Sequence, residues 1–162
     1  MVGRMSPQKA PDVFIKMAKQ VKDKVPNAHF IIVGNGNQET KIRKYAEDNN
    51  FSESLHITGW VDNPMSYVEI FDVACLLSRW EGFGLALPEY MMAGKPIVAS
   101  RVDAIPNIIR NGENGLLATV YKGNIIKNLI MDCQSYTKYR PNETTGGIFV
   151  SWRRKEELPT GA

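Results

Sequence analysis

Residues 73–100, VACLLSRWEGFGLALPEYMMAGKPIVAS, form a complete strand–helix–strand unit in the sequence. The apolar runs at 73–77 and 96–100 have the length and composition typical of buried strands. Residues 84–93 predict a helix between them, and Gly94 stands where a helix end favours glycine. Because parallel strands need a crossover of this kind, the unit indicates a parallel sheet covered by helices.

The same alternation extends in both directions from this unit. We expect further helices at 11–25, 39–49, 65–71 and 105–110, with Gly112 after the last of them, and further strands at 1–3, 29–33, 55–58 and 115–117. In the first helix apolar residues recur every three to four positions, and Pro11 opens it at a position where a missing N–H is tolerated. The sequence therefore predicts a doubly wound α/β fold with a Rossmann-like parallel sheet.

The length of the chain suits one compact domain. It has 162 residues, of which 43% are hydrophobic, and this is enough to bury a core of its own. We predict this domain at 1–139, with an amphipathic helix over 125–133. Residues 140–162 lack a clear period and are expected to form an irregular tail, in which GIFVSW offers a short edge strand.

Composition excludes several classes of function. The net charge is +3, without a run of like charges, so no nucleic-acid-binding arm is expected. No apolar stretch in the sequence has the length of a membrane span or the form of a signal peptide, which leads us to expect a cytoplasmic protein. Cys75 and Cys133 lack metal-like spacing and are expected to be reduced thiols.

Ligands of open α/β sheets bind beyond the carboxyl ends of the strands, so the loop after residue 77 is a candidate site. Gly82 and Gly84 allow a ligand to approach the backbone closely. Glu81 lies before the helix and Glu89 about one turn inside it, so two carboxylates flank a helix N-terminus that suits a phosphate. This pattern favours a nucleotide sugar, whose hydroxyls need acceptors. In the alternative interpretation both glutamates are ordinary surface residues.

The segment EGFGLALPEYMMAGKPIVAS resembles the signature of the retaining group 1 glycosyltransferases, a family with two Rossmann-like domains (the GT-B architecture). The resemblance covers residues 1–118 in order and includes VGRMSPQKAPDVF, FIIVGNGNQETKI, LHITGWVDN and AIPNIIRNGENGLLA. It implies that this chain is the donor-binding domain of such an enzyme.

The resemblance also implies roles for individual residues. Arg4 and Lys9 would hold the donor diphosphate, Glu81 would bind hydroxyls of the transferred sugar, and Glu89 would bind the ribose diol. We predict Arg4, Lys9 and Glu81 as the catalytic set. For Arg4 and Lys9, solvated surface cations remain the alternative.

Backbone groups supply the other predicted donor contacts. The resemblance places Gly82, Phe83, Gly84 and Leu85 beside the phosphate and sugar, and Gly59, Trp60 and Val61 beside the base. For the Trp60 ring, packing is the more frequent role of such a residue. We expect Trp60, Trp80, Phe83 and Leu85 to form an uncovered apolar wall of the cleft.

Three further features bear on cofactors. GNGN at 34–37 lacks the third glycine of a dinucleotide fingerprint, so it indicates a tight turn and not NAD binding. No Asp-x-Asp pair occurs in the sequence, and we expect neither a metal nor another cofactor. His29 and His56 lie in predicted strands and are expected to be structural residues.

Some residues depart from the family pattern. Ala10, Ala104 and Asn107 stand where the family commonly has two glycines and an acid, which puts donor affinity in doubt. No counterpart of the family's N-terminal acceptor domain is recognised, so we expect transfer by this chain alone to be very slow.

The resulting expectation is a hexosyltransferase that uses a nucleotide-diphosphate sugar in polysaccharide biosynthesis. Its acceptor is a saccharide or a lipid-linked molecule, and the full enzyme associates peripherally with a membrane. An inactive nucleotide-binding or scaffolding module, or half of a sugar-nucleotide epimerase or phosphorylase, remains as an alternative.

Overall fold

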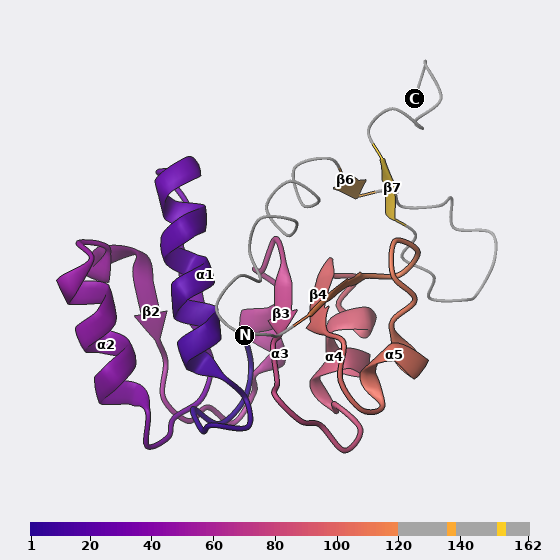
Figure 1. Cartoon of the computed structure of the whole chain (residues 1–162), viewed down its shortest axis with the longest axis horizontal. Coiled ribbons are helices and arrows are strands. Elements are labelled where there is room, and N and C mark those ends of the chain that lie inside the picture. The colour runs from indigo at the N-terminus through magenta and orange to yellow at the C-terminus, as the bar shows by residue number, and fades with distance from the viewer. Residues whose placement is uncertain (120–135, 139–151, 155–162) are drawn as a thin grey trace.

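The computed structural model describes residues 1–119, 136–138 and 152–154 (Figure 1). Its helices are α1 (Pro11–Lys24), α2 (Glu39–Asp48), α3 (Met65–Val68), α4 (Ala86–Met92) and α5 (Ile105–Ile108), with a short 3-10 helix at Ser52–Ser54. Its strands are β1 (Phe30–Ile32), β2 (Leu55–Ile57), β3 (Ala74–Leu76), β4 (Ile97–Ser100), β5 (Leu116–Ala118), β6 (Tyr136–Lys138) and β7 (Trp152–Arg154).

The strands before residue 120 pair in parallel, as the sequence predicts. Strand β1 pairs with β2, and β3, β4 and β5 follow one another in a second group. The predicted first strand is reduced to a single bridge, in which Val2 pairs with Val33 just beyond β1. The hydroxyl of Tyr90 accepts a hydrogen bond from the Val2 amide at 2.8 Å and donates one to the Cys75 carbonyl at 3.4 Å. The N-terminal segment therefore lies between the two groups of strands, as in a doubly wound sheet.

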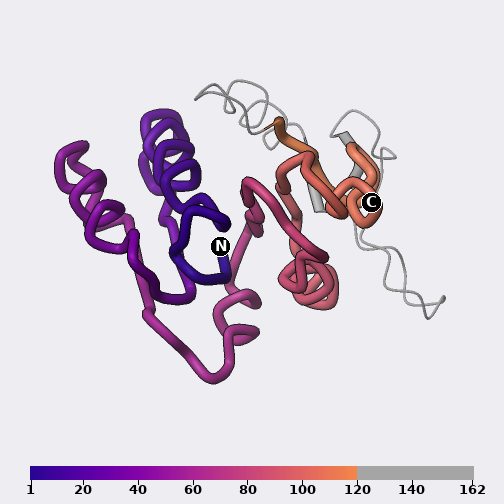
Figure 2. Tube along the Cα trace, turned by 60° about the horizontal axis from the view of Figure 1, so that its bottom comes forward, coloured from indigo at the N-terminus to yellow at the C-terminus, as the bar shows by residue number. Residues whose placement is uncertain are grey.

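The helices cover both faces of the strands. Along β3, Cys75 packs with α1 and α2 in one hydrophobic cluster. Its neighbours Ala74 and Leu76 pack in a second cluster with α3, α4 and α5. Because successive strand residues point to opposite faces, this alternation places the two sets of helices on opposite sides of the sheet. Figure 2 shows the two sets apart, with α1 and α2 in indigo to purple and α4 in pink.

The element boundaries follow local chemistry. Helix α4 ends at Met92, and Gly94 follows with a φ of 62°, a conformation that glycine adopts without strain. Helix α5 is shorter than predicted because Ile109, which is buried, has extended backbone angles. None of the helices in the described ranges is long and apolar enough to cross a membrane.

Two predictions concern residues after 119. The predicted helix over 125–133, with Cys133, lies outside the described residues. Of the predicted tail at 140–162 the structure describes only β7, which pairs antiparallel with β6 so that Tyr136 is opposite Arg154. The predicted division at 139/140 thus stays a prediction.

Cys75 is a free cysteine in the middle of β3. It is 6% exposed, and desolvation by burial raises the pKa of its thiol. Its free thiol agrees with the expectation of a reduced cysteine, and because the thiolate is the reactive form, the raised pKa makes this thiol unreactive.

Candidate functional site

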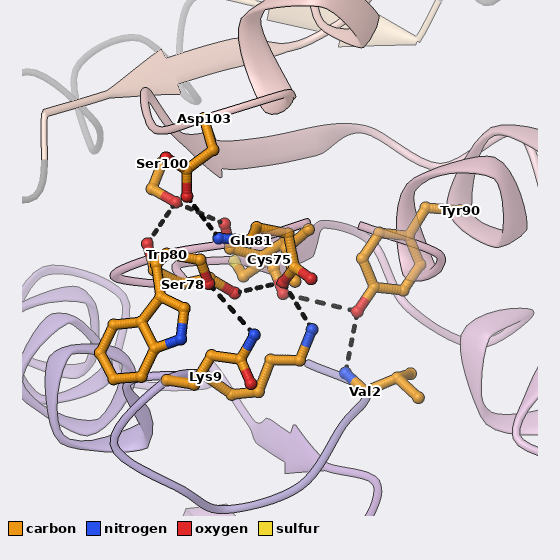
Figure 3. A network of polar contacts seen from close by, with 11 residues as sticks. Val2, Lys9, Cys75, Ser78, Trp80, Glu81, Tyr90, Ser100 and Asp103 are labelled. Carbon is orange, nitrogen blue, oxygen red and sulfur yellow. Dashed lines mark hydrogen bonds and ion pairs between the residues drawn. The ribbon is translucent and has the colours of Figure 1, made fainter. Parts of the chain in front are cut away.

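Two loops meet at the carboxyl ends of the strands. The first loop, residues 4–10, follows the N-terminal segment, and the second loop, residues 77–85, follows β3. Lys9 from the first loop and Glu81 from the second form an ion pair, with 2.5 Å between Nζ and Oε2. Their side chains are 20% and 8% exposed. Two of the three predicted catalytic residues, Lys9 and Glu81, are therefore in direct contact (Figure 3).

Buried serines fix the position of Glu81. The Ser78 hydroxyl donates a hydrogen bond of 2.8 Å to Oε2 of Glu81, the same oxygen that Lys9 binds. The Ser100 hydroxyl at the end of β4 donates one of 2.6 Å to the Ser78 carbonyl. Both serines are completely buried, so their hydroxyls need partners inside the protein. The carboxylate is thus held from the strand side.

Asp103 holds the backbone of the same loop. Its Oδ2 accepts a hydrogen bond of 2.7 Å from the Glu81 amide (Figure 3). Asp103 has a φ of 44°, a left-handed conformation that non-glycine residues adopt infrequently and that Asp tolerates better than most. Sequence reasoning missed Ser78, Ser100 and Asp103, although each follows an apolar strand run at its carboxyl end.

A second ion pair, closer to solvent, joins the second loop to the first turn of α1. Arg79 binds the Asp12 carboxylate through both terminal nitrogens, at 2.8 and 2.6 Å. It also donates to the Pro7 carbonyl from its side chain and to the Gln8 carbonyl from its backbone. The hydrogen bond from Arg79 lowers the pKa of Asp12. Bidentate geometry of this kind fixes orientation as well as distance, so Arg79 holds the second loop against α1 through Asp12 and against the first loop through the Pro7 and Gln8 carbonyls.

The GNGN segment supports the first loop from the other side. A β-carbon on Gly34 would lie 2.4 Å from the Gly3 carbonyl oxygen, and one on Gly36 would lie 2.4 Å from that of Met5. The Met5 amide donates to the Asn35 carbonyl at 2.8 Å. The turn therefore needs glycine because two backbones pack together, which gives GNGN a structural role.

Ala10 ends the first loop in a left-handed conformation, with a φ of 48° and a ψ of 53°. It is completely buried and directly precedes Pro11, the first residue of α1. The glycine that the family commonly has at this position would adopt these angles without strain. The structure thus accommodates the departure, with an alanine in a glycine-like backbone conformation.

The other predicted site residues near these loops lie on the first loop, on the second loop and on α4. Arg4 is exposed on the first loop, and Glu89 is half-buried in the first turn of α4. Gly82, Phe83 and Leu85 are exposed on the second loop, whereas Gly84 is buried with a φ of 83°. No ion pair joins Arg4 to another side chain in the part of the chain that the structure describes.

The segment after β2 contains the residues predicted beside the base. Gly59 has a φ of 72° and bridges to Gly34, which brings this loop next to the GNGN turn. Val61 packs against the second hydrophobic cluster. Trp60 is 78% exposed, which agrees with its expected place in an uncovered apolar wall and contradicts the alternative of a packed ring. Trp80, Phe83 and Leu85 are also exposed, as the sequence predicts.

These features define a class of protein: a doubly wound α/β domain with a cluster of charged side chains, the candidate site, at the carboxyl edge of its sheet. The family model for glycosyl transferases group 1 matches residues 1–138. The chain therefore belongs to this glycosyltransferase family, and its structural neighbours have the GT-B architecture.

Individual relatives agree with this membership. The chain is 32% identical over 120 residues to the UDP-Gal:alpha-D-GlcNAc-diphosphoundecaprenol alpha-1,3-galactosyltransferase of Escherichia coli, covering 72% of this chain and 31% of the relative. It is 30% identical over 164 residues to a poly(ribitol-phosphate) alpha-N-acetylglucosaminyltransferase of Staphylococcus aureus, covering 93% and 33%. The chain thus spans about a third of the length of these relatives.

A solved structure of TarM from S. aureus in complex with UDP, fondaparinux and alpha-GlcNAc-glycerol superimposes with a TM-score of 0.75 at 30% identity. The match covers 81% of this chain and 27% of that one.

Proposed function

We propose that this chain is the donor-binding domain of a retaining glycosyltransferase of the hexosyltransferase type. It binds a nucleoside-diphosphate sugar, and an acceptor-binding domain outside this chain presents a saccharide or a lipid-linked acceptor. The observation that carries the proposal is the Lys9–Glu81 ion pair, in which a cation and a carboxylate meet at the carboxyl ends of the strands.

The geometry of Glu81 suits recognition of sugar hydroxyls. Among the described residues, the two donors to its carboxylate both bind Oε2, which leaves Oε1 to accept from the sugar. Lys9 and Arg4 lie on the first loop, where they neutralise the diphosphate. When the bond between the sugar and the diphosphate breaks, negative charge grows on the leaving group, and fixed cations stabilise that state more than the ground state. This chemistry needs no metal ion.

We propose uridine as the base. The TarM relative, at 30% identity, was crystallised with UDP, and the exposed Trp60 ring is available for contact with a base. Glu89 would accept hydrogen bonds from the ribose diol. The relatives named above act on undecaprenol-linked and ribitol-phosphate acceptors, which supports a role in polysaccharide or surface-glycopolymer assembly at a membrane.

The two glutamates give the test. Glu81→Ala should weaken binding of UDP-sugars by about 1–3 kcal/mol, because a charged acceptor is removed, and leave UDP binding unchanged. Glu89→Ala should weaken the binding of UDP and of UDP-sugars by equal amounts. Calorimetric titration of UDP, UDP-glucose and UDP-N-acetylglucosamine into each variant measures this difference.

Glu47→Ala is the matched control, since Glu47 is an exposed carboxylate on α2. Equal losses of binding free energy in Glu81→Ala, Glu89→Ala and Glu47→Ala would mean a nonspecific electrostatic effect and would contradict the assigned roles. Loss of UDP binding in Glu81→Ala alone would reverse the two roles. Absence of binding by any nucleotide to the unaltered chain would contradict donor binding itself.

A further inference from the structure

The only two histidines of the 162-residue chain meet in space. Nδ1 of His29 lies 2.9 Å from Nε2 of His56. The ring centroids are 5.2 Å apart, and the ring planes are inclined by 25°. Both side chains are exposed to solvent, so neither histidine is held there by burial in the core.

The strand pairing explains the contact. His56 is the central residue of β2 and is opposite Ile31 of β1, and His29 directly precedes β1. By strand alternation His29, Ile31 and His56 face one side of the pair, opposite to the core residues Phe30 and Leu55. The two histidines are diagonal neighbours on that side, a spacing that long side chains bridge. The pairing of β1 with β2 thus places both imidazoles side by side.

We propose that His29 and His56 form a binding site for a divalent transition-metal ion, with Cu²⁺ and Ni²⁺ preferred. Imidazole is a common ligand of such ions, with a metal–nitrogen distance of about 2.0–2.1 Å for zinc. At that distance, two ligands at right angles are about 2.9 Å apart, whereas two tetrahedral ligands are about 3.3 Å apart. The present separation of 2.9 Å is a hydrogen-bond distance. It brings the two nitrogens within the span of one metal ion, and right-angled ligands, the arrangement of square-planar and tetragonal Cu²⁺ and Ni²⁺, need the smallest change of that separation.

Binding requires a shift of one proton and a rotation of both exposed rings, because two nitrogens that face each other in a hydrogen bond must turn to direct their lone pairs at one metal ion. In the neutral pair one ring donates its proton to the facing nitrogen of the other ring. On binding, that proton moves to the second nitrogen of the same ring, and both facing nitrogens give their lone pairs to the metal. The described residues contain no group of three or more His, Cys, Asp or Glu suited to a metal, so water completes the coordination.

The site is independent of the proposed donor site. His29 lies at the amino-terminal end of β1, whereas Lys9 and Glu81 lie in loops that follow the carboxyl ends of strands. Metal binding should therefore leave nucleotide affinity unchanged.

The experiment titrates Cu²⁺, Ni²⁺, Zn²⁺ and Mg²⁺ into the untagged chain and into His29→Gln, His56→Gln and the double variant. We expect one equivalent of Cu²⁺ or Ni²⁺ to bind the unaltered chain at least tenfold more tightly than either single variant. Zn²⁺ should bind more weakly than Cu²⁺, as it does at most nitrogen sites. Mg²⁺ should not bind, because it prefers oxygen ligands to imidazole.

Two further measurements identify the ligands. Electron paramagnetic resonance of the Cu²⁺ complex should show coupling to two nitrogens in the unaltered chain and fewer in the single variants. Thermal melts of the variants should match the unaltered chain, because both rings are exposed. Equal affinity of the unaltered chain and the double variant would overturn the proposal, as would a Cu²⁺ complex whose nitrogens persist in the double variant.

Discussion

The two loops of the candidate site are held in place by different kinds of interaction. The first loop packs its backbone against the GNGN turn, where Gly34 and Gly36 leave no room for a side chain. Side-chain hydrogen bonds from Ser78, Ser100 and Asp103 hold the second loop instead. A close contact between two backbones is disrupted when a mutation adds atoms between them. A network of side-chain hydrogen bonds is disrupted when a mutation removes one of its partners. The two loops should therefore respond to opposite kinds of mutation.

The largest effect is expected for Gly36→Ala. Its new β-carbon would lie 2.4 Å from the Met5 carbonyl oxygen and 2.8 Å from the Met5 nitrogen, so the backbone must move. We expect the free energy of unfolding to fall by about 3 kcal/mol, at the upper end of overpacking effects. Urea denaturation measures the loss.

Gly82→Ala is the matched control on the second loop. A β-carbon on Gly82 meets no atom within 4 Å, so this variant should unfold at nearly the same urea concentration as the unaltered chain. Similar losses in both variants would contradict the contrast between the loops.

The next effect concerns the inner ion pair. Lys9→Met leaves the Glu81 carboxylate without its cation, and we expect a loss of about 2 kcal/mol. This is less than the roughly 3–5 kcal/mol that is lost when one partner of a fully buried ion pair is removed. The loss is smaller here because Lys9 is 20% exposed and Ser78 still donates to the carboxylate. Lys9→Met combined with Glu81→Gln should restore part of the stability. An equal loss in Lys16→Met, an exposed lysine on α1, would show that the pair contributes nothing.

The outer pair should contribute less and should depend on pH. Arg79→Lys removes the bidentate contact with Asp12, and we expect a loss of about 1 kcal/mol at neutral pH, the scale of exposed pairs. Because Arg79 lowers the pKa of Asp12, the pair stabilises the fold above the ordinary carboxyl pKa of 3.8 and loses this contribution as the pH falls through the lowered value. Denaturation at several pH values measures both effects.

Arg101→Lys is the control for this pair, since Arg101 is exposed and comes after β4. A difference between Arg79→Lys and the unaltered chain that persists at the lowest pH would mean that the contacts of Arg79 with backbone carbonyls dominate.

The smallest effect is expected for Ala10→Gly. Glycine would relieve a left-handed strain of about 1–2 kcal/mol, but it loses a buried methyl group worth about 0.8 kcal/mol and gains freedom in the unfolded chain. We expect a net change within about 0.5 kcal/mol in urea denaturation. Ala10→Val, with a branched side chain at the same buried position, should destabilise the domain clearly. A large gain for glycine would show that strain dominates at this residue.

Much of the fold was predictable from local patterns. Apolar runs of strand length and helices with one apolar face gave the order of elements, and the loops after the strands located Lys9 and Glu81. The sequence left two interpretations of Trp60 open, a packed ring or an uncovered one, because an aromatic residue beside a glycine has no periodic neighbours that reveal whether its ring packs or stays exposed. The donor-binding roles of Lys9, Glu81, Arg4, Glu89 and the residues around the base remain predictions.

By itself the sequence determined the alternation of strands and helices, the family and the positions of the two loops, because these depend on residues close together in the chain. Only the tertiary structure decided which side chains meet. Lys9 and Glu81 are 72 residues apart, Asp12 and Arg79 are 67 apart, and His29 and His56 are 27 apart. Each pair forms because parallel strands bring their ends to a common edge or their residues to a common face, a register that no single segment encodes.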